Sequence, residues 1–243
     1  MSAVRVAVVA LARAVSEVLL PALCVACGDV LDGGDRGLCS GCRGRLVPMT
    51  EPCCPHCGQP DDDGGTCLDC ALAPPPQAGT VIWGVYDGVL RQSVLALKHG
   101  GHDELARVLG ARLGARIGLE EWCNEATAVA AVPSHGLRRL RRGWSAADWV
   151  AREVAVVLDR PLLPALRRHG LRRQSGRSRV QRNQLPRGSF SARPIVKGHR
   201  LVLVDDVSTT GTTLRRASES LLRAGADAVF CAAVAHAPDP RRV

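Results

Sequence analysis

Apolar residues in the C-terminal part of the chain recur with two different periods. Short apolar runs typical of strands lie at residues 80–86, 127–132, 201–204 and 228–235. Helix-like stretches lie between them, at residues 90–98, 103–117 and 145–158. The first strand alternates and is followed by Asp87-Gly88, which predicts a turn. Strands alternating with helices predict an α/β fold.

One stretch, residues 201–217, combines a strand with unusual chemistry. The strand runs into Asp205 and Asp206, and a loop rich in hydroxyl residues then opens a helix that continues through Leu222. The N–H groups and positive dipole end of a helix can receive a phosphate, and Gly211 lets the backbone approach it. The carboxylates can accept hydrogen bonds from ribose hydroxyls, and we expect both to face solvent. A plain β–α connection is the alternative, but this combination favours a sugar-phosphate site.

Cysteines dominate the N-terminal part of the chain. Nine of the 11 lie between Cys24 and Cys70, and eight of them form CxxC pairs. The paired residues are Cys24, Cys27, Cys39, Cys42, Cys54, Cys57, Cys67 and Cys70. Four thiolates complete a closed tetrahedral zinc site, so the spacing predicts two structural zinc ions rather than disulfides. Sequential pairing is the simplest arrangement and interleaved pairing remains open; Cys53 is the odd residue, and His56 is expected to be exposed rather than a ligand.

These patterns predict four parts of the chain. Residues 1–23 form an amphipathic helix, 24–72 the zinc module, 73–79 a proline-rich linker, and 80–243 the α/β domain. The N-terminal apolar run is broken by Arg13 and Glu17, which favours a packed helix over an export signal. No stretch has membrane-spanning length, so we expect no membrane insertion. Zinc-binding thiols indicate a cytoplasmic location.

The net charge of +9 favours anionic partners, either phosphorylated metabolites or nucleic acid. Arginines cluster at residues 138–142 and 167–187, where they form either an anion-binding surface or a solvated one. Aromatic residues make up only 3% of the chain, which argues against a base-stacking platform. Pro133, Ser134 and His135 follow a strand and are further candidates for phosphate contacts. Lys98 could reach a phosphate, although a solvated lysine at a helix end is the simpler reading.

The string from Asp205 to Thr213 resembles the PRPP-binding signature of type I phosphoribosyltransferases. With the CxxC pairs, the Lys98-His99-Gly100 segment and the Arg142-Gly143-Trp144 segment, nearly the whole chain resembles the ComF family of competence-associated proteins. The resemblance implies an open, mainly parallel sheet with helices on both faces, plus an N-terminal zinc-ribbon module.

The same resemblance assigns roles to the candidate residues. It implies that Asp205 and Asp206 are catalytic and hold the ribose hydroxyls of PRPP, which binds with magnesium. The remaining PRPP-binding residues are Val207, Ser208, Thr209, Thr210, Gly211, Thr212 and Thr213. Candidates for the pyrophosphate loop are Pro133, Ser134, His135, Arg138 and Arg142.

Two functions follow from the resemblance. In the first, the protein is a phosphoribosyltransferase linked to DNA uptake or processing, with an acceptor that the sequence does not identify. In the second, it binds PRPP or single-stranded DNA without transfer. Either one allows partners among the proteins of DNA uptake and processing.

Overall fold

The computed structural model describes residues 21–32, 35, 37–99, 103–134, 145–169, 186 and 188–238. Of the helix expected over residues 1–23, residues 1–20 lie outside these ranges and residues 21–23 are not helical. His135, Arg138 and Arg142 also lie outside them. Most of the second arginine-rich segment, residues 170–185 and 187, is outside them too. Among the described residues, no helix is both long and apolar enough to cross a membrane.

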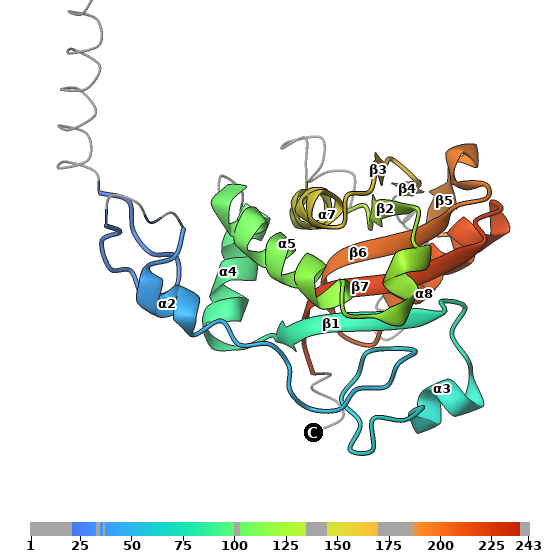
Figure 1. Cartoon of the computed structure of the whole chain (residues 1–243), viewed down its shortest axis with the longest axis horizontal. Helices are drawn as coiled ribbons and strands as arrows, with labels where there is room; N and C mark the ends of the chain where they lie inside the picture. Colours follow the sequence, from blue (N-terminus) through green and yellow to red (C-terminus); the bar gives the residue numbers. More distant parts are fainter. Residues whose placement is uncertain are drawn as a thin grey trace, which may run out of the picture.

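The described residues contain a central sheet, the helices that cover it and two small cysteine-rich ribbons (Figure 1). The first ribbon carries Cys24, Cys27, Cys39 and Cys42, and the second ribbon carries Cys54, Cys57, Cys67 and Cys70. The strands are β1 (Gly79–Val85), β2 (Ala128–Ala131), β3 (Leu162–Leu163), β4 (Leu166–Arg168), β5 (Phe190–Ala192), β6 (Arg200–Ser208) and β7 (Ala228–His236). The helices are α2 (Ser40–Gly44), α3 (Leu68–Leu72), α4 (Gly88–His99), α5 (Asp103–Ile117), α7 (Ala146–Val157) and α8 (Thr212–Arg223). Short 3-10 turns are η1 (Glu121–Glu125) and η3 (Pro194–Val196).

The main sheet has five strands in the order β1-β7-β6-β2-β3. All four neighbouring pairs are parallel, and β4 and β5 form a separate antiparallel pair. Strands of a parallel sheet that is covered on both faces carry apolar side chains on both faces. This holds for β6, in which Leu201 to Val204 are all buried. The predicted parallel α/β sheet is therefore confirmed.

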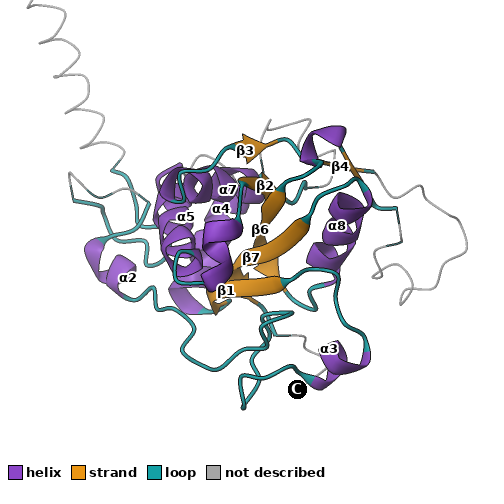
Figure 2. Ribbon diagram, turned by 45° about the vertical axis from the view of Figure 1, so that its right-hand side comes forward, coloured by secondary structure: helices purple, strands orange, loops and turns teal. Residues whose placement is uncertain are grey.

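Alternate residues of β6 belong to two different hydrophobic cores. Val202 and Val204 face α4, α5 and α7, which cover one side of the sheet. Leu201 and Leu203 face α8 and the β4–β5 pair on the other side (Figure 2). Helices therefore cover both faces, as expected, and β6 lies in the middle of the sheet.

The predicted helices agree closely with the observed ones. Helix α5 has the predicted bounds, and α7 begins one residue late because Ser145 is its N-cap. The Ser145 hydroxyl accepts a hydrogen bond from the backbone N–H of Asp148, whose carboxylate accepts one from the backbone N–H of Ser145. Asp87 lies in a bend, but Gly88 is already the first residue of α4, so the expected turn leads directly into a helix.

The alternating pattern of the first strand does not produce an exposed face. Every residue of β1 except Val85 is buried, because the second ribbon covers the face that α4 and α5 leave open. Thr80 donates its backbone N–H to the carbonyl of Pro55 at 2.8 Å and its hydroxyl to the carbonyl of His56 at 2.7 Å. A side chain at Gly58 would collide with Thr80 and Ile82.

The segment expected to be a linker is attached to the domain at its end. Gln77 is only 4% exposed, and the backbone N–H of Ala78 donates to the carbonyl of Val229 at 2.8 Å. Gly79 is the first residue of β1.

In the first ribbon, Leu38 and Leu46 join the core that contains Leu105. Both ribbons are thus packed on the α/β domain.

Candidate functional site

A cavity of about 230 Å³ lies at the carboxyl end of β2, beside the part of β6 that continues past it. Crevices at the carboxyl ends of parallel strands are the usual ligand sites of open α/β sheets. The cavity is lined by Lys98, Val132, Pro133, Ser134, Ser145, Ala147, Arg168, Asp205, Asp206, Val207 and Thr213. The structure thus brings together both predicted acids, one end of the hydroxyl loop and two of the residues expected to contact pyrophosphate.

The two acids lie inside β6, which continues to Ser208 instead of ending at Val204. Successive side chains of a strand point to opposite faces, so the two carboxylates have different surroundings. Asp205 is only 9% exposed, and its Oδ1 accepts the backbone N–H of Asp206 at 2.8 Å. The expectation that both acids face solvent is therefore wrong for Asp205, because it lies on the face that Arg168 and α8 cover.

Burial controls the charge of Asp205. Loss of water contact, and then the neighbouring charge of Asp206, raise the pKa of Asp205 to about 8. Lys98 and Arg168 act in the opposite direction but do not cancel the effect of burial. Burial also lowers the pKa of Arg168. Burial therefore favours the protonated form of Asp205, and the neighbouring Asp206 is the more accessible of the two acids.

The cavity has two basic residues, of which the sequence indicated Lys98 only as a less simple reading and Arg168 only as part of the second arginine-rich segment. Lys98 lies in the last turn of α4, and its Nζ lies 3.5 Å from Oδ1 of Asp206. The simpler reading, a solvated lysine, is wrong, because α4 packs so that its last turn reaches the strand end. Arg168 comes from β4, at the start of the arginine-rich segment. No local motif marks Arg168, and the Lys98-His99-Gly100 segment does not by itself show what Lys98 contacts, since both residues reach the acids only through tertiary packing.

The hydroxyl loop contributes an open helix start. Gly211 is the N-cap of α8 with φ of 69°, and no side chain caps the first turn. That left-handed conformation is the reason for glycine here, since a Cβ at Gly211 would meet nothing within 4 Å. Backbone N–H groups at such a start suit an anion. Thr213 lines the acidic cavity, whereas Thr210, Gly211 and Thr212 line a second cavity of about 120 Å³.

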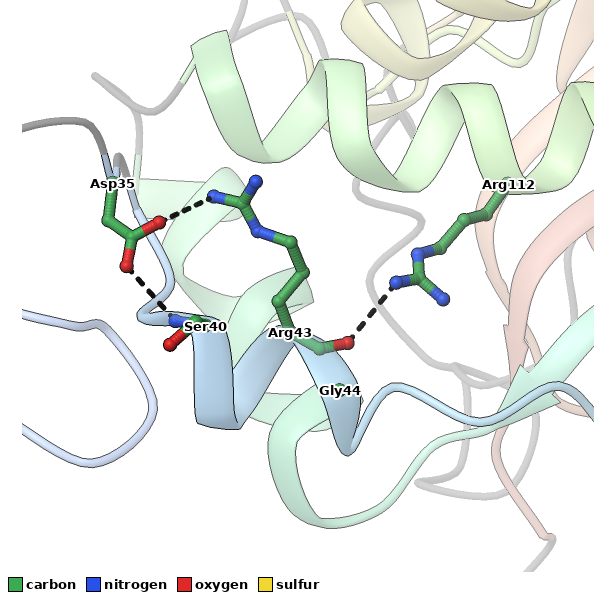
Figure 3. A pocket seen from close by; sticks show the side chains of 5 residues that line it. All are labelled: Asp35, Ser40, Arg43, Gly44 and Arg112. Atoms are coloured by element: carbon green, nitrogen blue, oxygen red, sulfur yellow. Dashed lines mark hydrogen bonds and ion pairs between the residues drawn. The ribbon is translucent and has the colours of Figure 1, made fainter.

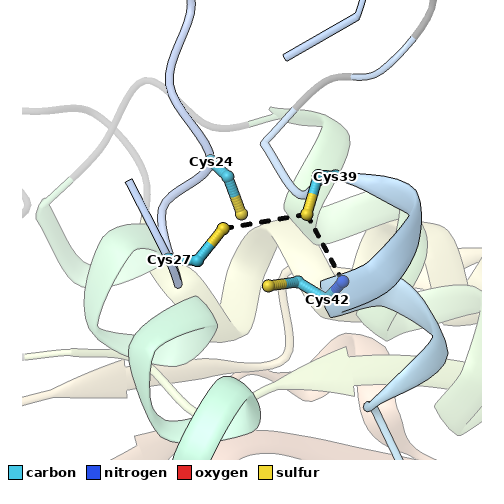
Figure 4. Close-up of side chains that lie close together, drawn as sticks. All are labelled: Cys24, Cys27, Cys39 and Cys42. Atoms are coloured by element: carbon cyan, nitrogen blue, oxygen red, sulfur yellow. Dashed lines mark hydrogen bonds between the residues drawn. The ribbon is translucent and has the colours of Figure 1, made fainter. Parts of the chain in front are cut away.

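Eight cysteines form two separate clusters, and in each cluster all four sulfur atoms lie within 4.8 Å of one another. The first contains Cys24, Cys27, Cys39 and Cys42 (Figure 4), and the second Cys54, Cys57, Cys67 and Cys70. The pairing is therefore sequential. Cys53 belongs to neither cluster, and its Sγ lies 3.1 Å from Sδ of Met49. His56 is not among the clustered residues either, and it is half-buried rather than fully exposed.

The sulfur positions fit tetrahedral zinc. Zinc–sulfur bonds of about 2.3 Å place neighbouring sulfurs about 3.8 Å apart. Cys27 and Cys39 have their Sγ atoms 3.8 Å apart, and Cys57 and Cys67 have theirs 3.7 Å apart. In the first cluster, the Arg45 guanidinium also donates to Sγ of Cys42 at 2.8 Å, which offsets part of the negative charge of four thiolates.

The two ribbons repeat the same local structure. In each, the first cysteine donates its backbone N–H to a residue five positions later and accepts one from the glycine four positions later, at 2.8–2.9 Å. These glycines, Gly28 and Gly58, have φ of 81° and 71°. Each third cysteine, Cys39 or Cys67, is then the N-cap of a five-residue helix. An internal duplication is therefore visible in the backbone.

Comparisons with known proteins agree with this architecture. Residues 15–71 match the double zinc ribbon domain, and residues 118–243 match the phosphoribosyl transferase domain. The DNA utilization protein YhgH of Salmonella typhi is 30% identical over 223 residues, which cover 86% of this chain and 95% of that protein. Competence protein F of Haemophilus influenzae is 28% identical over 215 residues, covering 85% of this chain and 93% of that protein.

Among solved structures, the glutamine PRPP amidotransferase from B. subtilis complexed with ADP and GMP is 27% identical. The match covers 53% of this chain and 25% of that chain with a TM-score of 0.39, and so partial a likeness adds no argument. The fold and the domain matches define a class, a phosphoribosyltransferase-type α/β protein with a double zinc ribbon. Within that class, the chain belongs to the ComF family.

The clusters predict the metal content of the protein. Purified protein should contain two zinc ions per chain. Cys54→Ser should lose the second zinc, because three thiolates leave the tetrahedron incomplete. Cys53→Ser is the matched control and should keep both, since its sulfur is bonded elsewhere. Elemental analysis with thiol counting measures both variants; one zinc in the wild type, or equal losses in the two variants, would contradict the assignment.

The buried acid predicts an unusual dependence of stability on pH. The pKa of Asp205 in the folded protein is above its ordinary value of about 3.9. The contribution of this group to stability is therefore fully present below pH 4 and lost as pH rises through 8. Asp205→Asn should be more stable than the wild type at pH 8, by on the order of a few kcal/mol, and the gain should disappear toward pH 4.

Thermal unfolding between pH 4 and pH 8 measures this effect. The amide oxygen of asparagine can still accept the backbone N–H of Asp206, so the local geometry is preserved. Asp227→Asn, at an exposed carboxylate before β7, removes the same charge without burial and is the matched control. A less stable Asp205→Asn variant at pH 8 would refute the account.

Proposed function

We propose that the cavity at the end of β6 binds PRPP with magnesium. The carboxyl groups of Asp205 and Asp206 hold the ribose hydroxyls, and the backbone and hydroxyls of residues 207–213 hold the 5′-phosphate. Pro133 and Ser134 face the pyrophosphate, together with Lys98. Bound magnesium neutralises part of the pyrophosphate charge. The observation that carries this proposal is the pair of acids at the end of a central strand, in one cavity with the first turn of α8.

The charges of the site support a ligand that is both anionic and rich in hydroxyls. Lys98 and Arg168 provide positive charge next to the acids, and the start of α8 presents uncapped N–H groups. A neutral Asp205 also reduces repulsion between the site and an anionic ligand. When this carboxyl loses its proton, two carboxylates can stabilise positive charge that develops on the sugar.

We propose phosphoribosyl transfer as the reaction of this site. In that reaction the bond between the anomeric carbon and pyrophosphate breaks, and pyrophosphate leaves with the electron pair. A nucleophile of the acceptor then forms the new bond to the same carbon. The protein contributes positioning and electrostatic stabilisation rather than proton transfer. A screen for pyrophosphate release over nucleobases and oligonucleotides identifies the acceptor, and binding without release would assign a non-catalytic role.

We further propose a role in DNA uptake or processing in the cytoplasm. The relatives are named for competence and DNA utilization, and the net charge is +9. Eight of the cysteines lie in two clusters of the metal-binding kind, and a reducing compartment favours such thiol sites over disulfides. Single-stranded DNA and other proteins of DNA uptake are the partners that fit this role.

Calorimetric titration with PRPP tests the binding site. Asp205→Asn combined with Asp206→Asn should abolish magnesium-dependent binding, and Thr213→Val should weaken it by about 1–3 kcal/mol through loss of a hydroxyl donor. Arg223→Gln, at the far end of α8 from the cavity, should bind as the wild type does. Wild-type affinity in the acid and Thr213 variants would show that the cavity is not the PRPP site.

Titration of a fluorescent single strand at several salt concentrations tests the second role. Scarcity of aromatic residues makes phosphate contacts the main source of affinity, so binding should not depend on base sequence. The log–log salt slope should be roughly −0.7 per phosphate neutralised. Neutralising Arg138, Arg139, Arg141 and Arg142 together should flatten the slope. Absence of binding at physiological salt would assign these arginines to another role.

A further inference from the structure

At each zinc ribbon, one arginine of the α/β domain donates to two main-chain carbonyls. For the first ribbon this residue is Arg112 of α5, which donates to Arg43 at 3.1 Å and to Leu46 at 3.2 Å. For the second it is Arg215 of α8, which donates to Ala73 at 3.2 Å and to Pro74 at 3.4 Å. Both pairs of carbonyls lie at or just beyond the end of the short ribbon helix. The duplicated ribbons therefore have equivalent attachments.

The two arginines differ in what else they contact. Arg112 lies midway along α5, beside a cavity of about 320 Å³ that Asp35, Ser40, Arg43 and Gly44 also line (Figure 3). Residues 207–213, which are proposed to hold the 5′-phosphate, are called the phosphate loop below. None of them lines that cavity. Arg215, in contrast, stands in the first turn of α8, where its backbone N–H donates to the carbonyl of Gly211 at 2.9 Å. It thus belongs both to the ribbon attachment and to the start of the phosphate helix.

The second ribbon also shares a cavity wall with the phosphate loop. Two of its metal-binding cysteines, Cys57 and Cys70, line the same cavity of about 120 Å³ as Thr210 and Thr212. Gln77, on the same wall, is 4% exposed. Its Nε2 donates to the carbonyl of His56 at 3.0 Å, and its buried Oε1 has no hydrogen-bond partner among the described residues. Zinc ligands and phosphate loop are therefore neighbours at this place, unlike at the first ribbon.

We infer that the binding of zinc by the second ribbon and the binding of a phosphate group by the phosphate loop strengthen each other. The first ribbon, in contrast, binds its zinc independently of the phosphate ligand. Zinc fixes Cys70 within α3, and α3 positions the carbonyls of Ala73 and Pro74 that hold Arg215. An anchored Arg215 keeps the first turn of α8 in the conformation that receives phosphate, which reduces the ordering cost of binding. Linkage between binding sites is reciprocal, so the bound ligand must also retain the zinc. This inference rests on the proposed function.

Cysteine alkylation of the zinc-loaded protein tests the coupling residue by residue. The protein is treated with N-ethylmaleimide, with and without saturating PRPP and magnesium, and the cysteine peptides are quantified by mass spectrometry. PRPP should slow alkylation of the second cluster by on the order of fivefold or more and leave the first cluster unchanged. Zinc that remains bound is measured in the same samples, which separates retention of metal from simple shielding of a thiol.

Variants of the two arginines show whether the protection passes through Arg215 or is a general effect of PRPP binding on the whole protein. Arg215→Gln should lose the protection, and Arg215→Lys should lose most of it, because a lysine keeps the charge but not the fork that reaches two carbonyls. Arg112→Gln removes the equivalent attachment of the first ribbon and should keep the protection of the second cluster. Thermal unfolding checks that each variant is folded.

The possible outcomes are distinguishable. PRPP binding by calorimetry with equal or no protection of the two clusters overturns the inference and leaves the proposed function intact. Protection that persists in both Arg215 variants overturns it as well. Failure of the wild type to bind PRPP overturns both the proposed function and the inference.

Discussion

A carboxyl group buried at the end of a central strand is the constraint on which this structure depends. Leu201 to Val204, which precede Asp205 in β6, are fully buried on both faces, so the strand delivers the acid to a place that the surrounding elements have already enclosed. Desolvation raises the pKa of Asp205 to about 8, and among the described residues Lys98 and Arg168 offset this effect only in part. The protein tolerates this cost at the cavity that Asp205 lines, and such a local cost is typical of sites where function and stability conflict.

The surroundings of this acid come from distant parts of the chain. Lys98 arrives from the end of α4, Arg168 from β4, and Thr213 from the first turn of α8. Parallel pairing of β2 with β6 brings Pro133 and Ser134 to the same edge. Because these residues stand on packed strands and helices, their positions are set by the two cores and not by the loop sequence alone.

The zinc ribbons show how a duplicated unit can acquire two different environments. Their local hydrogen bonds and glycine conformations are nearly the same, since metal geometry and the tight CxxC turn dictate them. Their surroundings differ: the first ribbon extends the core of α4 and α5, whereas the second covers β1 and borders the hydroxyl-rich loop before α8. The same fold element therefore packs against a helical layer in one place and against a strand and a loop in the other.

Elements with local causes could be predicted from the sequence. The period of Leu105, Leu109, Leu113 and Ile117 predicts α5, CxxC spacing predicts the zinc clusters, and the acid–hydroxyl string predicts the strand, loop and helix start. The sequential pairing of the cysteines, the burial of Asp205, the approach of Lys98 and the coverage of β1 became clear only from the folded chain. These features depend on contacts between residues far apart in the chain, and neither periodicity nor spacing carries information about which distant surface will cover a given side chain.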